Sequence, residues 1–247
     1  MTTTVAAPRT PALERPVAMR LAKTEYDRTI AQLRTLQPAD WTKLTDCPGW
    51  DVHALVSHVV GMAEMSAWLP EQVKQMRAAS KSEGEFIDAL TALQVAKHAD
   101  DTPAQLIARL EVIGPKAAKG RRRTPGLLRR RTLPMSQPVG TATEQWTLGY
   151  LIDIIITRDP WMHRVDVARA AGRDVEVTAE HDGVLVADIV NEWATRHGRP
   201  CTVELTGPAG GRWTFGTGGT EMSEDTVTFC RGLSGRGEPA YGTAVPF

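Results

Sequence analysis

Two residue types that bind metals recur at helical spacing near the middle of the chain. Within "RDPWMHRVDVARAAGR" (158–173), Asp159 and His163 are four residues apart, and Asp166 follows three residues later. Residues four apart lie on one face of a helix, so a carboxylate and an imidazole at this spacing could share a metal ion. The same spacing is common in polar pairs on helix surfaces, so both interpretations stay open until a third ligand is found.

A third ligand must come from another element, and His58 is the candidate among the six histidines. In "ALVSHVVGMAE" (54–64) its neighbours at helical spacing are apolar, which places it on or beside the buried face of a helix. We expect His98, which stands beside acidic residues in a polar connection, to be solvated. Two inward-facing histidines and a carboxylate on two helices match the composition of a metal site in a bundle core.

Asp159 has two features of its own. It shares a face with isoleucines one and two turns upstream, and burying its charge there is costly unless a cation meets it. Pro160 follows directly, so the backbone at Asp159 is biased away from helical dihedrals. We expect a kink or a local bulge in the helix at this point.

Apolar spacing and capping signals predict the elements that must hold these residues. Four helices are expected, at 17–36, 51 to the late 70s (kinked or divided near Pro70), 102–113 and 144–171, with an irregular segment at 114–143. Such a set suits a four-helix bundle.

After Gly172 the apolar residues no longer recur at helical spacing alone, and short alternating segments appear between glycines and prolines. Strands are expected at 174–178, 201–207 and 211–218, a helix at 182–198, and a strand or short helix at 226–237. The predicted class is therefore α+β, with three parts: a disordered tail (1–16), a helical bundle (17–172) and a small α+β domain (173–247).

The composition limits the kinds of partner. Lys+Arg and Asp+Glu both total 29, so no net charge favours nucleic acid or an anionic membrane. No apolar run approaches the length of a membrane span, and the start lacks a secretory pattern, so we expect a cytoplasmic protein. One stretch, 116–131, holds eight basic and no acidic residues. A solvated connection is the preferred interpretation, a mobile lid the second, and a nucleic-acid site the third.

Three cysteines without a CxxC pair indicate reduced thiols rather than a disulfide framework or a cysteine-based zinc site. Cys47 precedes a helix N-terminus, but no base stands near it in the sequence, so we interpret it as a small buried apolar residue. Trp50, just before the same helix, is expected to be a packing residue.

Two segments together resemble a known family. "TDCPGWDVHALVSHVVGMAE" (45–64) and "TRDPWMHRVDVARAAGR" (157–173) resemble the mycothiol-dependent maleylpyruvate isomerase family, which belongs to the DinB-like metal-binding four-helix bundles. The end of the chain, from "VELTGPAGGRWTFGTGG" (203–219) onward, is similar to the small α+β domain of that family. The resemblance covers the chain from about residue 17.

The resemblance implies a metal site and its ligands. His58, Asp159 and His163 match the three ligands, although the usual acidic ligand is Glu, not Asp. The implied metal is a divalent ion, most often Zn²⁺, with one open position for the thiol of mycothiol. Asp166 matches a recurrent position that could orient an imidazole or the thiol, and Arg236 matches a position associated with substrate binding.

The resemblance also implies a reaction class. In the isomerase branch, the activated thiolate adds to a cis-alkene, the new single bond rotates, and elimination gives the trans product. In transferase branches the thiolate stays attached to the electrophile. The expected partner is a small electrophilic substrate, anionic if Arg236 binds it, with the chain a monomer or homodimer. The alternative is a non-catalytic metal- or thiol-binding regulator of the same fold.

Overall fold

The computed structural model describes residues 7–247, which fall into two compact units. The helical unit contains residues 15–125 and 159–175. The mixed unit contains residues 126–158 and 176–247 together with the chain up to Glu14. The expected α+β class is confirmed, because helices build the first unit and both sheets lie in the second.

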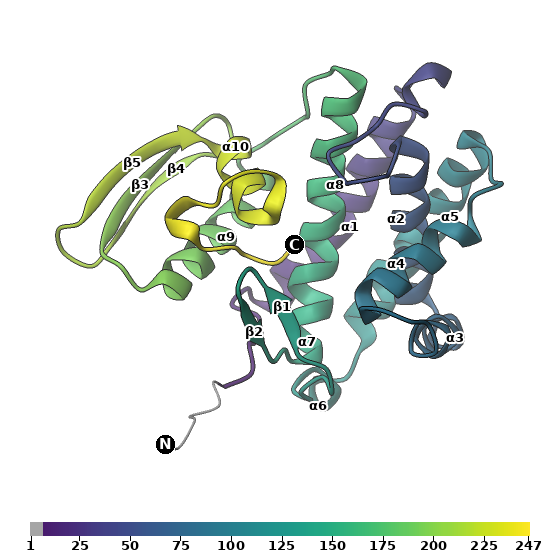
Figure 1. Ribbon diagram of the computed structural model, residues 1–247, viewed down its shortest axis with the longest axis horizontal. Coiled ribbons are helices and arrows are strands. Elements are labelled where there is room, and N and C mark those ends of the chain that lie inside the picture. The colour runs from purple at the N-terminus through teal and green to yellow at the C-terminus, as the bar shows by residue number, and fades with distance from the viewer. Residues whose placement is uncertain (1–6) are drawn as a thin grey trace. The chain divides into compact units, whose positions relative to one another are not determined.

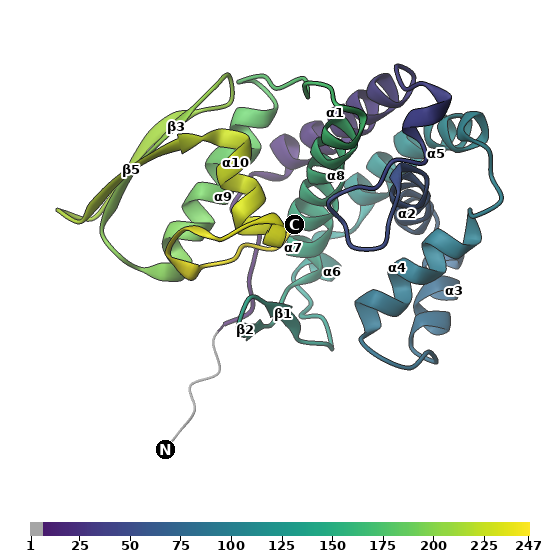
Figure 2. The ribbon, with the colours of Figure 1, turned by 45° about the horizontal axis from the view of Figure 1, so that its top comes forward.

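The helical unit contains the metal-binding candidates. Its helices are α1 (Arg15–Leu33), α2 (Val52–Ala67), α3 (Leu69–Ala79), α4 (Phe86–Lys97), α5 (Pro103–Arg123) and, from Asp159, α8 (Ile156–Ala171). Buried side chains of α1, α2, α5 and α8 form one apolar core, which is the expected four-helix bundle (Figure 1). α4 also packs on α2, and α3 packs on both (Figure 2).

Local signals explain where several of these helices begin and end. The Asp51 carboxylate accepts a hydrogen bond from the N–H of Ala54 at 2.8 Å and so caps α2. Thr102 and Gln105 form a capping box at the start of α5. α2 ends before Pro70, which lies in the first turn of α3, so of the kink or division expected at this proline the structure shows the division.

Two helical predictions in this region are wrong. The segment 114–143 is not irregular throughout, because α5 continues past Pro115 to Arg123. Gly114 lies against Tyr26 of α1 and Gly120 against the Ser66 carbonyl of α2, and this close packing outweighs the hydrogen bond lost at the proline. The second error is α4, which the sequence pattern did not predict. Its N-cap, Glu85, makes no side-chain cap, so no local signal marks its start.

The connection to α8 lies in the mixed unit. It contains α6 (Gly126–Arg129), the antiparallel pair β1 (Gln137–Val139) and β2 (Ala142–Glu144), α7 (Leu148–Tyr150) and a π-helical turn at Leu151–Ile155. The π turn runs directly into α8, so the helical irregularity expected near Pro160 lies just upstream of it, and α8 itself passes through Pro160. π turns are frequent near functional sites.

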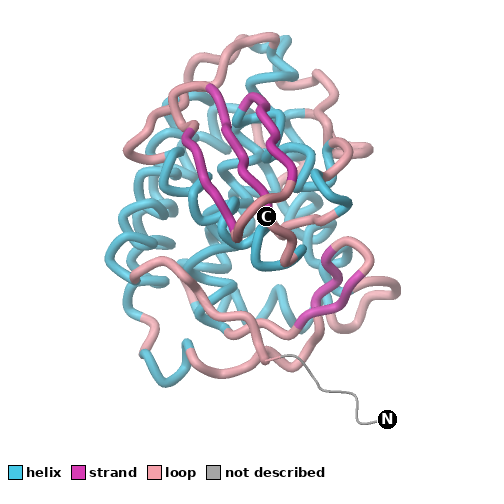
Figure 3. Tube along the Cα trace, turned by 90° about the vertical axis from the view of Figure 1, so that its left-hand side faces the viewer, coloured by secondary structure: helices cyan, strands magenta, loops and turns pink. Residues whose placement is uncertain are grey.

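The rest of the mixed unit is a small α/β layer. α9 (Asp182–His197) and α10 (Thr226–Arg231) accompany a sheet of β3 (Cys201–Thr206), β4 (Gly211–Phe215) and β5 (Thr220–Asp225) in the order β4-β3-β5 (Figure 3). β3 pairs antiparallel with β4 and parallel with β5. The predictions of α9, β3 and β4 are confirmed, and Gly198, at φ 63°, ends α9 as expected.

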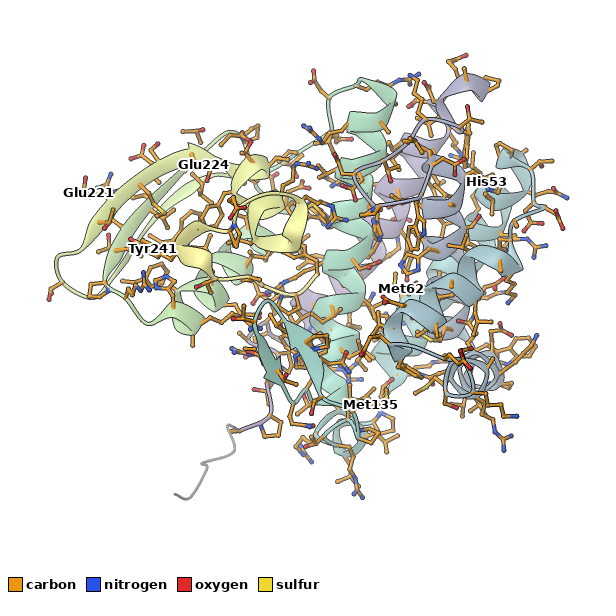
Figure 4. The ribbon with its side chains drawn as sticks, viewed as in Figure 1. His53, Met62, Met135, Glu221, Glu224 and Tyr241 are labelled. Atoms are coloured by element: carbon orange, nitrogen blue, oxygen red, sulfur yellow. The ribbon has the colours of Figure 1, made fainter. Side chains whose placement is uncertain are left out.

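Two details differ from prediction, and one open alternative is decided. Residues 174–178 form no strand, since the Thr178 N–H donates instead to the Asp182 carboxylate, at 2.7 Å, at the start of α9. β5 was missed because its residues are mostly exposed and polar; Glu221 and Glu224 are labelled on it in Figure 4. The segment 226–237 is helical, with α10 followed by a π turn to Arg236.

The predicted tail (1–16) is only partly within the described residues, which exclude 1–6. The remainder is structured. The Arg9 N–H donates to the Gln145 carbonyl at 2.7 Å, its guanidinium pairs with Glu144 at 3.0 Å, and α1 begins at Arg15. The expected boundary after residue 172 stays a prediction. The two compact units are interleaved along the chain rather than divided at one point.

Candidate metal site

α2 and α8 bring the three predicted ligands together. His58 lies in the middle of α2 and is 5% exposed, whereas Asp159 and His163 lie one turn apart on α8. A buried ion pair between Arg164 Nε and Glu25 Oε1, at 2.9 Å, holds this part of α8 against α1. The imidazole centroids of His58 and His163 are 5.3 Å apart, with their planes nearly perpendicular at 85°.

The three side chains aim their ligand atoms at one point. His58 Nε2 lies 3.4 Å from Asp159 Oδ2, and His163 Nε2 lies 3.5 Å from Asp159 Oδ1. The ligand atoms of all three residues lie within 4.8 Å of one another. A tetrahedral set with bonds of about 2.0–2.2 Å has edges of about 3.3–3.6 Å. Each nitrogen–oxygen separation lies in this range, although the two end on different oxygens of Asp159, so the carboxylate spans the gap between the two imidazoles.

The hydrogen bonding of Asp159 supports this fit. Its Oδ2 is buried and has no hydrogen-bond partner among the described residues. A buried carboxylate oxygen without a partner costs free energy unless a cation compensates it. Burial would raise the pKa of the Asp159 carboxyl, but the charges of His163 and His58 hold that pKa far below its usual range. The residues present therefore fit a divalent metal with two imidazoles and one carboxylate.

The second nitrogen of each imidazole also has a partner. His58 Nδ1 lies 2.7 Å from the side-chain oxygen of Gln94 on α4, and His163 Nδ1 lies 3.2 Å from Asp166 Oδ2. Such outer contacts fix the orientation of a metal-binding imidazole. Asp166 thus lies in the position from which a carboxylate can orient the His163 imidazole. Gln94 was missed because nothing in the sequence predicts α4 or relates it to His58.

Cys47 is not the isolated apolar residue that the sequence indicated. Its Sγ lies 3.8 Å from His163 Nδ1 and 3.6 Å from Asp166 Oδ2, and its side chain is half-buried. These partners are more than a hundred residues away along the chain, so local sequence could not reveal them. Trp50 packs on the core as expected, but its ring also lies 5.3 Å from that of His58 and 6.4 Å from that of His163.

Two further expectations concern basic residues. Arg236 ends the π turn that follows α10, in the mixed unit, and its guanidinium lies 3.2 Å from Ser234 Oγ. Its role in substrate binding stays a prediction. The stretch 116–131 is a solvated connection only in part, because six of its eight basic residues are exposed but the stretch begins inside a helix and two of its arginines are buried. Residues 116–123 belong to α5, where Arg121 is 2% exposed, and Arg129 is buried in an ion pair with Asp153.

Comparison with known proteins gives the family. Residues 22–168 match the family described as the mycothiol maleylpyruvate isomerase N-terminal domain, which is more than half of the chain. The chain belongs to this family. The matched segment includes His58, Asp159, His163 and Asp166, and the family assignment made from the sequence is confirmed.

Solved structures agree with the mycothiol maleylpyruvate isomerase fold. The chain resembles a crystal structure of a mycothiol-dependent maleylpyruvate isomerase, at 18% identity and a TM-score of 0.56. It also resembles that of a histidine-to-alanine mutant of such an enzyme, at 17% identity and the same TM-score. Each comparison covers 91% of this chain and 90% of the other. No curated protein matches the chain. Across residues 7–247, every helix is too short or too polar to cross a bilayer.

Proposed function

We propose that the chain is a zinc-dependent enzyme that uses mycothiol to act on a small electrophilic substrate. The observation that carries this proposal is the convergence of His58 Nε2, His163 Nε2 and the Asp159 carboxylate, whose ligand atoms lie within 4.8 Å of one another. Three protein ligands leave one position open, which is the pattern of catalytic zinc sites. When bound there, the metal would lower the pKa of a thiol and supply a thiolate nucleophile.

The residues around the site divide the remaining tasks. His58, Asp159 and His163 would hold the ion, and the anionic Asp159 would offset part of its charge. Asp166 would accept a hydrogen bond from His163 Nδ1–H and so keep the Nε2 atom of His163 directed at the ion. Trp50 would cover the imidazoles on one side and limit the approach of water. Arg236 is the proposed partner of an anionic substrate group.

We place isomerisation ahead of thiol transfer. Both solved structures that the chain resembles are described as mycothiol-dependent maleylpyruvate isomerases, and a cis-alkene conjugated to carbonyl groups is the electrophile suited to that reaction. We also place the protein in the cytoplasm, where its free cysteines would stay reduced.

Metal analysis and a turnover assay test the proposal. The purified protein should contain about one zinc per chain and should isomerise maleylpyruvate only when mycothiol is present. A thioether product would instead support thiol transfer. Replacement His58→Ala or His163→Ala should remove both metal and activity, whereas His53→Ala, in the first turn of the same helix α2 (Figure 4), should retain them. Absence of metal after reconstitution with zinc would refute the proposal, and metal without turnover would favour a regulatory protein.

A further inference from the structure

A chain of buried amides connects His58 to the neighbouring helices. Gln94 of α4 is 2% exposed and Gln75 of α3 is 6% exposed. Gln94 contacts the His58 ring, and Gln75 contacts Gln94 on the side away from the ring. His58 Nδ1 lies 2.7 Å from Gln94 Oε1, and Gln94 Nε2 lies 2.9 Å from Gln75 Oε1. Gln75 Nε2 in turn lies 3.1 Å from the Gly61 carbonyl oxygen and 3.0 Å from Glu71 Oε1. We call Gln94 and Gln75 the amide relay.

The packing of α4 on α2 is adapted to this contact. Gly61 faces Gln94 so closely that an added Cβ would lie 2.7 Å from Gln94 Cβ and 2.8 Å from its Cγ. Real Cβ atoms essentially never approach so closely, so only glycine allows α4 this position. A glycine inside a helix costs about 1 kcal/mol relative to alanine. Its presence in α2 therefore has a packing reason, namely access of Gln94 to His58.

The direction of every hydrogen bond in the relay follows from its far end. A main-chain carbonyl can only accept, and so can an ionised carboxylate. Burial would raise the pKa of Glu71, but hydrogen bonds from Lys97 and Gln75 lower it below its usual range, so Glu71 is ionised. The NH₂ group of Gln75 must therefore face Gly61 and Glu71, and its oxygen must face Gln94.

The orientation of Gln75 also determines which nitrogen of His58 carries a proton. Since Gln75 offers an oxygen, Gln94 must present its NH₂ group to Gln75 and its oxygen to His58. An amide oxygen accepts only, so His58 Nδ1 must carry a proton. The Gly61 carbonyl cannot be reversed, so it fixes the orientation of both amide groups and thereby the proton on His58 Nδ1.

We infer that Gln94 and Gln75 are positioning residues that fix His58 as the Nδ1–H tautomer, with Nε2 directed at Asp159 and available to a metal. His58 Nε2, 3.4 Å from Asp159 Oδ2, is then ready as a ligand with no tautomer change. Outer hydrogen bonds to metal-binding histidines typically contribute 10- to 100-fold to metal affinity. The consequence for metal affinity rests on the proposed function, whereas the tautomer assignment does not.

Nitrogen NMR of the full-length protein, prepared metal-free with a chelator, tests the tautomer directly. In ¹⁵N-labelled protein, at a pH where the ring is neutral, the couplings of His58 should report a proton on Nδ1. In Gln94→Leu the Nε2–H form should appear, and in Gln75→Leu a mixture should appear, because Gln94 is then free to reverse its amide. Gln72→Leu, on the same helix as Gln75 but outside the relay, should leave the tautomer unchanged.

Zinc affinity, measured by competition with a chromogenic chelator, provides the second readout. It should fall about 10- to 100-fold in Gln94→Leu, less in Gln75→Leu, and not at all in Gln72→Leu. If Gln94→Leu does not fold by circular dichroism, Gln75→Leu decides both readouts. An Nε2–H form in the unmodified protein, or an unchanged tautomer in the relay variants, overturns the inference. A protein with the expected tautomers that binds no zinc would instead overturn the proposed function and leave the relay intact.

Discussion

Asp159 reaches both imidazoles although its side chain is one carbon shorter than the glutamate that the family resemblance implies. Each of its two oxygens lies within 3.5 Å of a different Nε2 atom. The difficulty foreseen from Pro160 does not arise, because α8 stays helical through the proline and the π turn lies upstream. At the scale of single residues, the site therefore depends on a short carboxylate held close to both rings.

Replacing that carboxylate tests its part in the site. In Asp159→Asn, a neutral amide stands in place of an anionic ligand of nearly the same size. Zinc affinity should fall by more than the roughly 10- to 100-fold associated with loss of an outer hydrogen bond. Chelator competition measures this change, and Asp46→Asn, at an exposed ion pair with Arg169, is the matched control. Equal affinity in the two variants would exclude Asp159 as a ligand.

The three cysteines should differ sharply in reactivity. Cys201 and Cys230 are fully buried, and burial raises the pKa of both thiols, that of Cys230 to about 12. Cys47 is half-buried and is the most accessible of the three. An aromatic disulfide reagent at neutral pH should therefore modify one thiol rapidly in the folded protein, and Cys47→Ser should abolish that phase. Two or more fast thiols would contradict the burial of the other cysteines.

At the scale of elements, the approach of α4 to α2 is a constraint that a single methyl group should disturb. Gly61→Ala would gain about 1 kcal/mol of helix propensity, but overpacking costs typically 1–3 kcal/mol. We expect a lower melting temperature together with weaker zinc binding, because Gln94 would be displaced from His58. Gly126→Ala, where an added Cβ meets nothing within 4 Å, is the control. Unchanged zinc affinity in Gly61→Ala would show that α4 adjusts without moving Gln94.

A second junction links α2 to the connection that follows α4, and it should respond to pH. The expectation that His98 is solvated is wrong, because this side chain is only 2% exposed. Glu64 Oε2 lies 3.2 Å from its Nε2, and Asp101 Oδ2 lies 2.7 Å from its Nδ1. Burial alone would lower the pKa of His98, but hydrogen bonds to Glu64 and Asp101 raise it above its usual value. The protonated form is therefore favoured in the folded state.

The sign of the pH effect follows from this raised pKa. The stabilisation is complete below the unfolded pKa of about 6.5 and is lost as pH rises through the higher folded value. His98→Gln should lower the free energy of unfolding by about 1–3 kcal/mol at pH 6 and by less at pH 9. Urea unfolding at both values measures the difference. A larger loss at pH 9 than at pH 6 would contradict the assigned charge state.

At the scale of the whole molecule, neither compact unit is a continuous segment. Residues 126–158 belong with residues 176–247, and Arg158 is buried in ion pairs with Asp188 at 2.6 Å and Glu192 at 2.9 Å. A fragment ending at residue 172 would leave this arginine without both partners, and breaking a buried pair costs about 3–5 kcal/mol. It should melt well below the full chain and bind a hydrophobic dye. A fragment as stable as the full chain would support the boundary predicted after residue 172.

The sequence was sufficient for some parts of this molecule and not for others. His58, Asp159 and His163 could be found because helical spacing fixes which residues share a face. α9, β3 and β4 were likewise predictable from periodicity and from Gly198. Gln94 and Cys47 could not be found, because each meets its imidazole through tertiary packing that no local pattern encodes. The extension of α5 through Pro115 has the same origin, since close packing overrides a local signal.

The continuity of α8 has one more consequence. Arg158 and Asp159 are consecutive in this helix, yet the first is held by the ion pairs of the mixed unit and the second faces two imidazoles of the helical unit. A ligand that binds only the folded state slows local opening of the segment it binds. Zinc should therefore slow amide deuterium exchange along α8 on both sides of this junction, so that occupancy of the site is reported by backbone amides of both units.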